Sequence, residues 1–200
     1  MMKGFTLVET LVVSAILLLV MVGVTLFQRD VFYLNSVQNA SFSTIQDARS
    51  ILRTMTQELR STAPGGDGSY PVITASTSTL TFYSDVNNDG VSDRIRYFLA
   101  TTTLSRGVII ATGSPITYNT SNEKIATLAS NVRNNASSTS VFDYFDGTYN
   151  GTSSPLAQPV AVSAVRNVKI TIILDLDPNR SPTPRTYVTD VTLRNLKDNL

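Results

Sequence analysis

Residues 5–27 read FTLVETLVVSAILLLVMVGVTLF, and Glu9 is the only formally charged side chain among them. An apolar run of about 20 residues is long enough to cross the hydrocarbon core of a membrane as a helix. Lys3 precedes the run and Arg29 follows it, so flanking charge orients such a helix only weakly. A secretory signal has a shorter apolar stretch of about 7–15 residues and a cleavage site after it. Here the candidate break, at Lys3-Gly4, comes before the apolar residues.

Glu9 is unexpected in this apolar run, because a charged side chain is costly inside a membrane. An acid at the centre of a membrane helix costs about 2.5–3.5 kcal/mol on insertion scales, and such acids usually have a partner. Glu9 lies near the edge of the run, so its cost is smaller, but the need for a partner remains. If the chain were cut after Gly4, the new α-amine on Phe5 would be a cation below a pKa of about 8. Glu9 of one subunit and the amine of another could then neutralise each other, which would dock the two subunits in register.

The stretch KGFTLVETLVV, residues 3–13, closely resembles the processing site of type IV prepilins and pseudopilins. The resemblance implies that residues 1–4 are a leader, that a prepilin peptidase cuts between Gly4 and Phe5, and that Phe5 is then N-methylated. It implies that Glu9 pairs with the N-terminus of a neighbouring pilin during assembly. The chain would cross the bacterial inner membrane once and then join a pilus or pseudopilus on its outer side. Many major pilins have a helix-kinking proline where this chain has Leu26, which favours a minor subunit.

The helix is expected to continue beyond the membrane. Five apolar residues follow a 3-4-3-4 spacing that puts them on one face of a helix, with charged and amide side chains between them: Ile45, Ala48, Leu52, Met55 and Leu59. Pro64 and the Gly65-Gly66 pair end the helix. We therefore divide the chain into a leader (1–4), a membrane and assembly half (5–28), a second helical half (29–63) and a globular domain (64–200). Residues 32–42 are more polar and less periodic, and could fray or bend.

The residues after Pro71 have the pattern of strands. STLTFYS (78–84) and RIRYFLA (94–100) flank a turn-rich loop, and TLSRGVIIA (103–111) continues the pattern. The clearest alternation is VKITIILDLD (168–177), whose apolar residues include Leu176. Its expected partner is RTYVTDVTLRNL (185–196), joined to it by an exposed polar loop. A long helix followed by strands predicts an α+β fold, with the helix packed on an antiparallel β-sheet in a pilin-like domain.

The section from about residue 113 to residue 159 is rich in Ser, Thr, Asn and Gly. We find no repeat and no long periodic element in it. A loop of this length in a compact domain is often functional or partly disordered, so we expect one long polar loop here.

The stretch DVNNDGVSD, residues 85–93, resembles the first half of a calcium loop. About five oxygen ligands are available, from four side chains and one main-chain carbonyl: Asp85, Asn87, Asp89, Asp93 and the Val91 carbonyl. The bidentate acid of an EF-hand is missing, because Arg96 stands at the twelfth position. Asn-Asp-Gly between two strands is also a common hairpin turn. We favour the plain turn. A bound calcium ion would have only a structural role, in stabilising the loop.

Composition excludes several classes of function. The chain has 200 residues, of which 16% are charged, and its formal net charge is +1, which does not indicate a nucleic-acid binder. It contains no Cys and no His, so the commonest metal ligands and the commonest general base are missing. One Ser-x-x-Lys spacing, Ser121 and Lys124, is a weak match to a nucleophile and its base. We therefore expect no enzyme and no required cofactor.

Beyond the leader, four stretches resemble the J-type minor pseudopilins and W-type minor pilins. They are ARSILRTMTQELRSTA (48–63), FYSDVNNDGVSDRIRYFL (82–99), TTTLSRGVI (101–109) and YVTDVTLRNL (187–196). The resemblance implies a structural subunit at the tip or initiation complex of a type IV pilus or type II secretion pseudopilus. The alternative is a membrane-anchored module whose aspartate-rich or polar loop binds calcium or adheres to a surface. The choice between pilus, secretion and DNA-uptake systems stays open.

Overall fold

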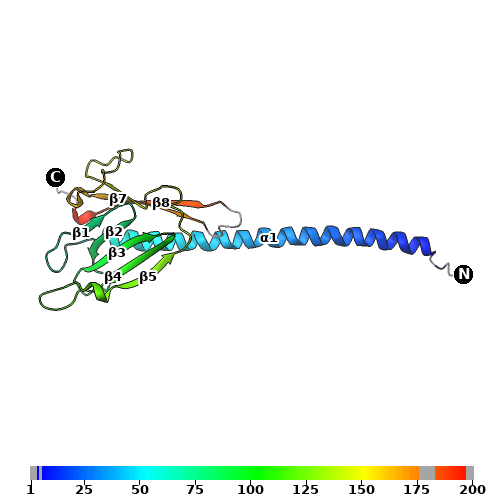
Figure 1. Cartoon of the computed structure of the whole chain (residues 1–200), viewed down its shortest axis with the longest axis horizontal. Coiled ribbons are helices and arrows are strands. Elements are labelled where there is room, and N and C mark those ends of the chain that lie inside the picture. The colour runs from blue at the N-terminus through cyan, green and yellow to red at the C-terminus, as the bar shows by residue number, and fades with distance from the viewer. Residues whose placement is uncertain (1–3, 5, 176–182, 197–200) are drawn as a thin grey trace. The chain divides into compact units, whose positions relative to one another are not determined.

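The computed structural model describes residue 4, residues 6–175 and residues 183–196, without the side chains of residues 36–44. Three of the residues named from the sequence lie outside this part of the chain: Lys3 before the apolar run, Phe5 at the cleavage point and Leu176 in a strand. The chain divides into two compact units, residues 1–43 and residues 44–200. Figure 1 labels the helix and most of the strands.

The N-terminal helix, α1 (Leu7–Arg60), is one continuous element of 54 residues. The segment contains no proline, so every residue can donate its backbone N–H to the helix. The backbone of residues 32–42, where fraying or bending was considered, remains helical. A long first helix is therefore confirmed.

The end of α1 comes three residues before the expected position 63. The Ser61 hydroxyl donates to two main-chain carbonyls of the last turn, at 3.1 Å each, which satisfies groups that a longer helix would have used. Thr62 instead forms an antiparallel bridge with Ser84, and its carbonyl accepts a hydrogen bond from Asn195 Nδ2 at 2.8 Å. These contacts join the end of the helix to the strands.

The larger sheet is antiparallel and has the strand order β1-β2-β3-β4-β5. Its strands are β1 (Val72–Ala75), β2 (Thr79–Ser84), β3 (Asp93–Ala100), β4 (Thr103–Ile109) and β5 (Lys124–Ala129). The hairpin β2–β3 pairs Ser84 with Asp93 and Thr79 with Phe98, so the aspartate-rich stretch forms its turn. The three strands predicted in this part of the chain are confirmed as β2, β3 and β4.

A second antiparallel sheet has the order β6-β7-β8, with β6 (Phe142–Phe145), β7 (Asn167–Leu174) and β8 (Arg185–Thr192). Leu174 lies opposite Arg185 and Asn167 opposite Thr192, which confirms the predicted pairing of the last two strands. The 3₁₀ turns are η1 (Thr120–Asn122), η2 (Val162–Ala164) and η3 (Arg194–Leu196). The expectation of one sheet is corrected to two.

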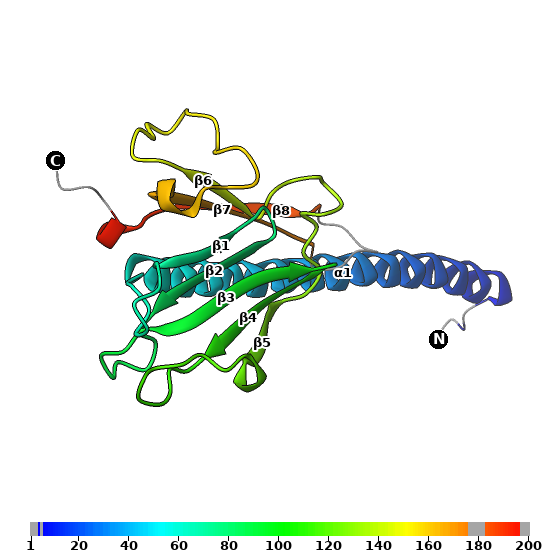
Figure 2. The ribbon, with the colours of Figure 1, turned by 60° about the vertical axis from the view of Figure 1, so that its left-hand side comes forward.

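The core of the second unit lies between the 45–60 part of α1 and the inner faces of both sheets (Figure 2). The predicted stripe is confirmed, with Ala48, Met55 and Leu59 buried and Ile51 added to them. Ile45 and Leu52 are half-buried at its border. A fully buried side chain of this size contributes about 1.5–3 kcal/mol, so this stripe is a main reason why the helix stays on the sheets.

The expectation of one long loop from 113 to 159 is wrong. This section contains β5 and β6, and it contributes three fully buried residues, Val132, Asn134 and Val141, between them. β5 is an edge strand with mostly exposed side chains, and β6 has only four residues. Neither strand has the long apolar alternation by which a strand is found in a sequence.

Candidate functional site

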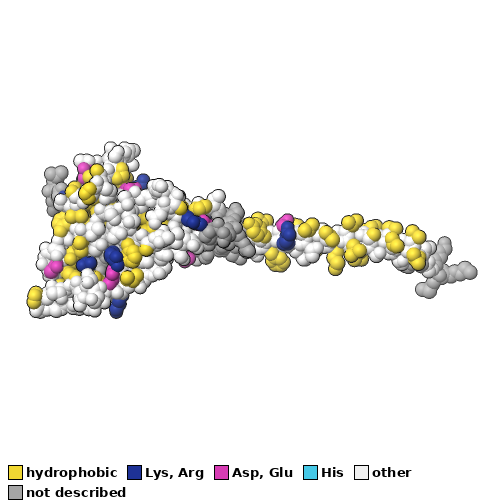
Figure 3. Space-filling view, viewed as in Figure 1, with side chains coloured by type: hydrophobic (Ala, Val, Ile, Leu, Met, Phe, Trp, Pro, Cys, Tyr) yellow, Lys and Arg dark blue, Asp and Glu magenta, His cyan; other side chains and the backbone are white. Residues whose placement is uncertain are grey.

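The first candidate site is the apolar part of α1. Residues Leu7–Asn35 are long and apolar enough to cross a membrane, and none of the most apolar stretch is buried in the structure. Leu7 is 80% exposed and Phe27 is 69% exposed. Figure 3 shows hydrophobic side chains distributed along this part of the helix. An apolar surface of this length is covered by something outside the chain, either lipid or other helices.

Three hydroxyl groups in this segment form hydrogen bonds within the helix. Thr10 Oγ1 donates to the Leu7 carbonyl at 2.9 Å, and Ser14 Oγ donates to the Leu11 carbonyl at 2.9 Å. Thr25 Oγ1 donates to the Val22 carbonyl at 3.1 Å. These three polar side chains therefore need no water, which suits an apolar environment.

Glu9 has a partner in its own chain. The Thr6 hydroxyl accepts a hydrogen bond from the Glu9 N–H at 3.3 Å, and Glu9 Oε2 accepts one from the Thr6 N–H at 3.5 Å. This reciprocal pair is a capping box, in which two backbone donors at the start of a helix are satisfied by side chains. The spacing Thr-x-x-Glu before an apolar run is the sequence signature of a capping box, and it gives Glu9 a partner within its own chain.

The capping box places the Glu9 carboxylate at the N-terminal end of α1, where the unpaired N–H groups and the helix dipole favour a negative charge. Gly4 lies two residues before Thr6, and Phe5 between them lies outside the described part of the chain. The carboxylate is thus held at the end of the helix that follows the predicted cleavage point in the sequence.

Residues 1–25 match the prokaryotic N-terminal methylation motif. This motif is the one found at the N-terminus of type IV pilins and pseudopilins, so residues 1–25 of the chain are similar to theirs. The match covers the leader, Glu9 and most of the apolar segment, and the α+β arrangement of a long helix followed by antiparallel sheets is pilin-like. The motif implies processing by a prepilin peptidase and assembly with other pilins, which are structural proteins and not enzymes. No curated protein matches the chain.

The aspartate-rich turn of this pilin-like domain is the second candidate site. Asp85 accepts backbone hydrogen bonds from Asp89 at 3.3 Å and from Gly90 at 2.9 Å. Asp89 accepts from the Val91 N–H at 2.8 Å and from the Asn87 amide at 2.7 Å. Gly90 has a φ of +85°, which only glycine adopts at no cost. The side-chain oxygens here hold the turn together.

Asp93, the last of the predicted calcium ligands, is fully buried. Its carboxylate accepts from the Ala111 N–H at 3.0 Å and from the Val86 N–H at 3.4 Å, so it ties the turn to the end of β4. Burial raises the pKa of Asp93, although its two backbone hydrogen bonds act in the opposite direction. Within the described residues, no group of three or more His, Cys, Asp or Glu is placed to hold a metal ion. The calcium site stays a prediction, which a titration tests.

A half-buried ion pair, which the sequence analysis did not anticipate, fastens α1 to the larger sheet. Glu58 accepts hydrogen bonds from Arg106 of β4 and from the Tyr97 hydroxyl of β3. Burial, and then the charge of Glu58, raise the pKa of Tyr97, which therefore stays a neutral donor. The pattern of the sequence contains no sign of this contact, because its three residues come from three separate elements.

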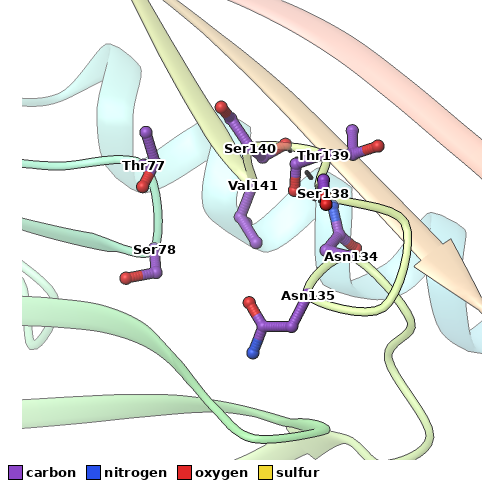
Figure 4. A pocket seen from close by; sticks show the side chains of 8 residues that line it. All are labelled: Thr77, Ser78, Asn134, Asn135, Ser138, Thr139, Ser140 and Val141. Carbon is purple, nitrogen blue, oxygen red and sulfur yellow. Dashed lines mark hydrogen bonds between the residues drawn. The ribbon is translucent and has the colours of Figure 1, made fainter.

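A polar pocket lies between the β1–β2 turn and the segment before β6 (Figure 4). Asn134 is fully buried there and takes the place of a strand beside β7: Nδ2 donates to the Thr171 carbonyl at 2.8 Å, and Oδ1 accepts from the Ile173 N–H at 2.9 Å. None of the lining residues carries a charge: Thr77, Ser78, Asn134, Asn135, Ser138, Thr139, Ser140 and Val141. The pocket thus offers hydrogen bonds but no acid or base.

Proposed function

We propose that the protein is a minor pilin or pseudopilin that is incorporated at the tip or initiation complex of a type IV pilus or type II secretion pseudopilus. One observation supports this above the rest: an exposed apolar helix begins at Leu7, within the methylation motif, and carries Glu9 in its first turn. Before assembly, the chain is held in the inner membrane by that helix. In the filament, the helices of other pilins take the place of lipid around it.

Processing is proposed to cut the chain between Gly4 and Phe5 and to methylate the new N-terminus on Phe5. The Glu9 carboxylate then has two possible partners, the Thr6 N–H of its own chain and the terminal amine of a neighbour. An ionised partner forms a stronger hydrogen bond than a neutral one, so the amine of a neighbour outcompetes the 3.5 Å contact with Thr6. Glu9 is the assembly residue in this scheme.

The assignment as a minor subunit of the J or W type rests on the four stretches that resemble those groups. In the fold they correspond to the packed part of α1, the β2–β3 hairpin, β4, and β8 with η3. The last stretch supplies Asn195, which holds the end of α1. Leu26 lies within the continuous helix where many major pilins have a proline.

Intact-mass analysis of the protein purified from cells that contain a prepilin peptidase tests the proposal. We expect a chain that begins at Phe5 and carries one added methyl group. Gly4→Val should block this processing, because the β-branched side chain stands at the bond to be cut. Gly23→Val is a matched control, since an added Cβ meets nothing within 4 Å at either glycine. A wild-type chain that keeps its first four residues in such cells would refute the proposal.

A further inference from the structure

Two adjoining clefts form one groove between the outer face of α1 and β8, and we call it the basic groove. It is lined by Arg49, Arg53 and Arg60 of the helix and by Arg185, Tyr187 and Val188 of the strand, with smaller neutral residues between them. Arg49 lines both clefts, so the two clefts adjoin at this residue. All of these residues belong to the second unit of the chain.

The charge of the basic groove is of one sign. The four arginines are exposed, and no acidic residue lines the groove within the described part of the chain. None of the four forms an ion pair with a described residue. The protein as a whole has a net charge of only +1, so this concentration of arginine is local.

The acids of the same elements do not line the groove. On α1, Asp47 lines a different cleft beside β5, and Glu58 accepts hydrogen bonds from Arg106 of the larger sheet. On β8, Asp190 follows the groove residue Thr189 and accepts a hydrogen bond from the Tyr149 hydroxyl at 3.4 Å. The arginines therefore lack the local partners that a solvated surface helix commonly has three or four residues away.

The strand side of the groove is an open sheet edge. β8 pairs with β7 on one side, and no described strand pairs with it on the other. Alternate residues of such an edge direct N–H and C=O groups outward, which lets another extended chain add to the sheet. Val188, at 50% exposed, offers an apolar contact beside them.

The spacing of the arginines suits an extended chain. Arg49 and Arg53 lie four residues apart on the helix, a rise of about 6 Å at 1.5 Å per residue. Side chains on one face of a strand recur about every 6.6 Å. Acidic residues at every second position of an added strand would therefore reach successive arginines while the backbone pairs with β8.

We propose that the basic groove binds an acidic, extended segment of a neighbouring pilin subunit, which adds as a strand to the free edge of β8. The existence of that neighbour rests on the proposed function, whereas the chemistry of the groove does not. A nucleic acid would use the arginines but not the strand edge, so the open edge favours a peptide.

A binding experiment with the full-length protein in detergent micelles tests the chemistry directly. The probe is a fluorescent eight-residue peptide in which Glu alternates with Thr and Val, followed by fluorescence anisotropy. We expect saturable binding that Arg49→Glu with Arg53→Glu weakens by about tenfold or more, because opposite charges are replaced by like charges. Lys124→Glu, an exposed charge reversal on the edge strand β5, should leave binding unchanged.

Two further probes separate the alternatives. The same peptide with N-methylated backbone amides keeps its charge but cannot pair with a strand, and it should bind about tenfold more weakly if a strand is added. Equal binding of both peptides would overturn the strand addition. Equal or tighter binding of a single-stranded oligodeoxynucleotide would overturn the preference for an acidic peptide, and unaltered binding to the double variant would overturn the site.

Photo-crosslinking in cells locates the neighbour. A photoreactive residue at Val188 should yield an adduct with another pilin, whereas the same residue at Ile125, 57% exposed on β5, should yield much less. If the protein is processed and incorporated but Val188 gives no more adduct than Ile125, the groove proposal fails and the proposed function stands. If the chain is neither cut nor incorporated, the proposed function fails, and the peptide experiment still decides the chemistry of the groove.

Discussion

The first part of α1 is exposed, whereas one face of its last part is buried. Residues 7–35 are exposed throughout, with Leu19 at 74%, and up to Phe27 they are apolar on every side apart from Glu9 and a few hydroxyl side chains. Residues 45–60 are apolar on one face only, and that face is buried by the protein's own sheets, with Leu59 at 1%. A helix that is apolar all round needs an environment that surrounds it, whereas an amphipathic helix needs only one packed layer.

The two parts of α1 therefore have different roles: residues 45–60 stabilise the domain, and residues 7–35 make contacts outside the chain. The stripe of 45–60 can be tested by unfolding the isolated protein, because its partners lie in the same chain. The segment 7–35 can be tested only where lipid or other subunits are present. Substitutions in residues 45–60 should therefore lower stability in an unfolding assay, whereas substitutions in residues 7–35 should have effects only when lipid or other subunits are present.

The largest expected effect is the loss of assembly in Glu9→Ala. Without the carboxylate, nothing pairs with the amine of the neighbour, so we expect incorporation into filaments to fall below detection while membrane insertion is retained. Immunoblots of sheared filaments and of membranes measure the two. Asp30→Ala removes another acid from the same helix and should assemble normally. Normal filaments with Ala at position 9 would show that Glu9 has no docking role.

The next effect concerns the buried part of the helix. Leu59→Ala should lower the free energy of unfolding of the domain by about 2–5 kcal/mol, because it leaves a cavity under both sheets. Leu19→Ala, the same change at an exposed position, should leave this free energy unchanged. Denaturant titrations in detergent, followed by near-UV circular dichroism, measure both. Equal losses for the two variants would break the distinction drawn between the two parts of α1.

Asn134→Ala extends the test to the polar section that was predicted to be a loop. The substitution leaves the Thr171 carbonyl and the Ile173 N–H of β7 buried without a partner, which should cost about 2–3 kcal/mol of unfolding free energy. Asn135→Ala removes one exposed hydrogen bond to Thr101 and should cost less than about 1 kcal/mol. If Asn134→Ala lowers the unfolding free energy no more than Asn135→Ala does, the 113–159 section contributes little to the core.

Gly107→Ala should have a smaller effect, about 1 kcal/mol, at an ion pair on the larger sheet. A Cβ at this position collides with the Glu123 carboxylate, which would have to leave Arg96 at 2.7–2.8 Å. Gly147→Ala is the matched control, since its Cβ would meet only Arg166 Cγ at an ordinary 3.8 Å. Thermal unfolding of the two variants is the measurement, and equal stabilities would refute the clash.

The smallest expected effect is that of calcium. Because the carboxylates of the β2–β3 turn already accept backbone hydrogen bonds, we expect millimolar calcium to leave the melting temperature unchanged relative to magnesium. A ligand that binds only the folded state would raise it in a saturable way. A saturable rise that Asp89→Asn abolishes would establish the calcium site and contradict the plain turn.

The sequence predicted the features that depend on a repeated pattern. The apolar run before Arg29, the stripe ending at Leu59 and the alternation in β7 each extend over several residues and were correctly assigned. β5 and β6 were missed because an exposed edge strand and a four-residue strand have too little alternation. The hydrogen bonds of the Asn134 side chain to the backbone of β7 could not be predicted, because a single residue forms no sequence pattern.

The candidate site was predictable to a different degree. Gly4, Phe5 and Glu9 follow a local motif, and the match over residues 1–25 covers all three. The capping box between Thr6 and Glu9 was also local and could have been found from its spacing. The basic groove could not, because Arg49 and Arg185 are brought together only by the packing of β8 beside the helix.

The junction at Thr62 has a mechanical consequence. Its backbone pairs with Ser84 of β2, and its carbonyl is held by Asn195, which follows β8. Traction that reaches the end of α1 is therefore passed to both sheets at this junction, in addition to the contacts of the buried stripe and of Glu58. A subunit that is pulled by its stem would resist through both halves of its domain at once.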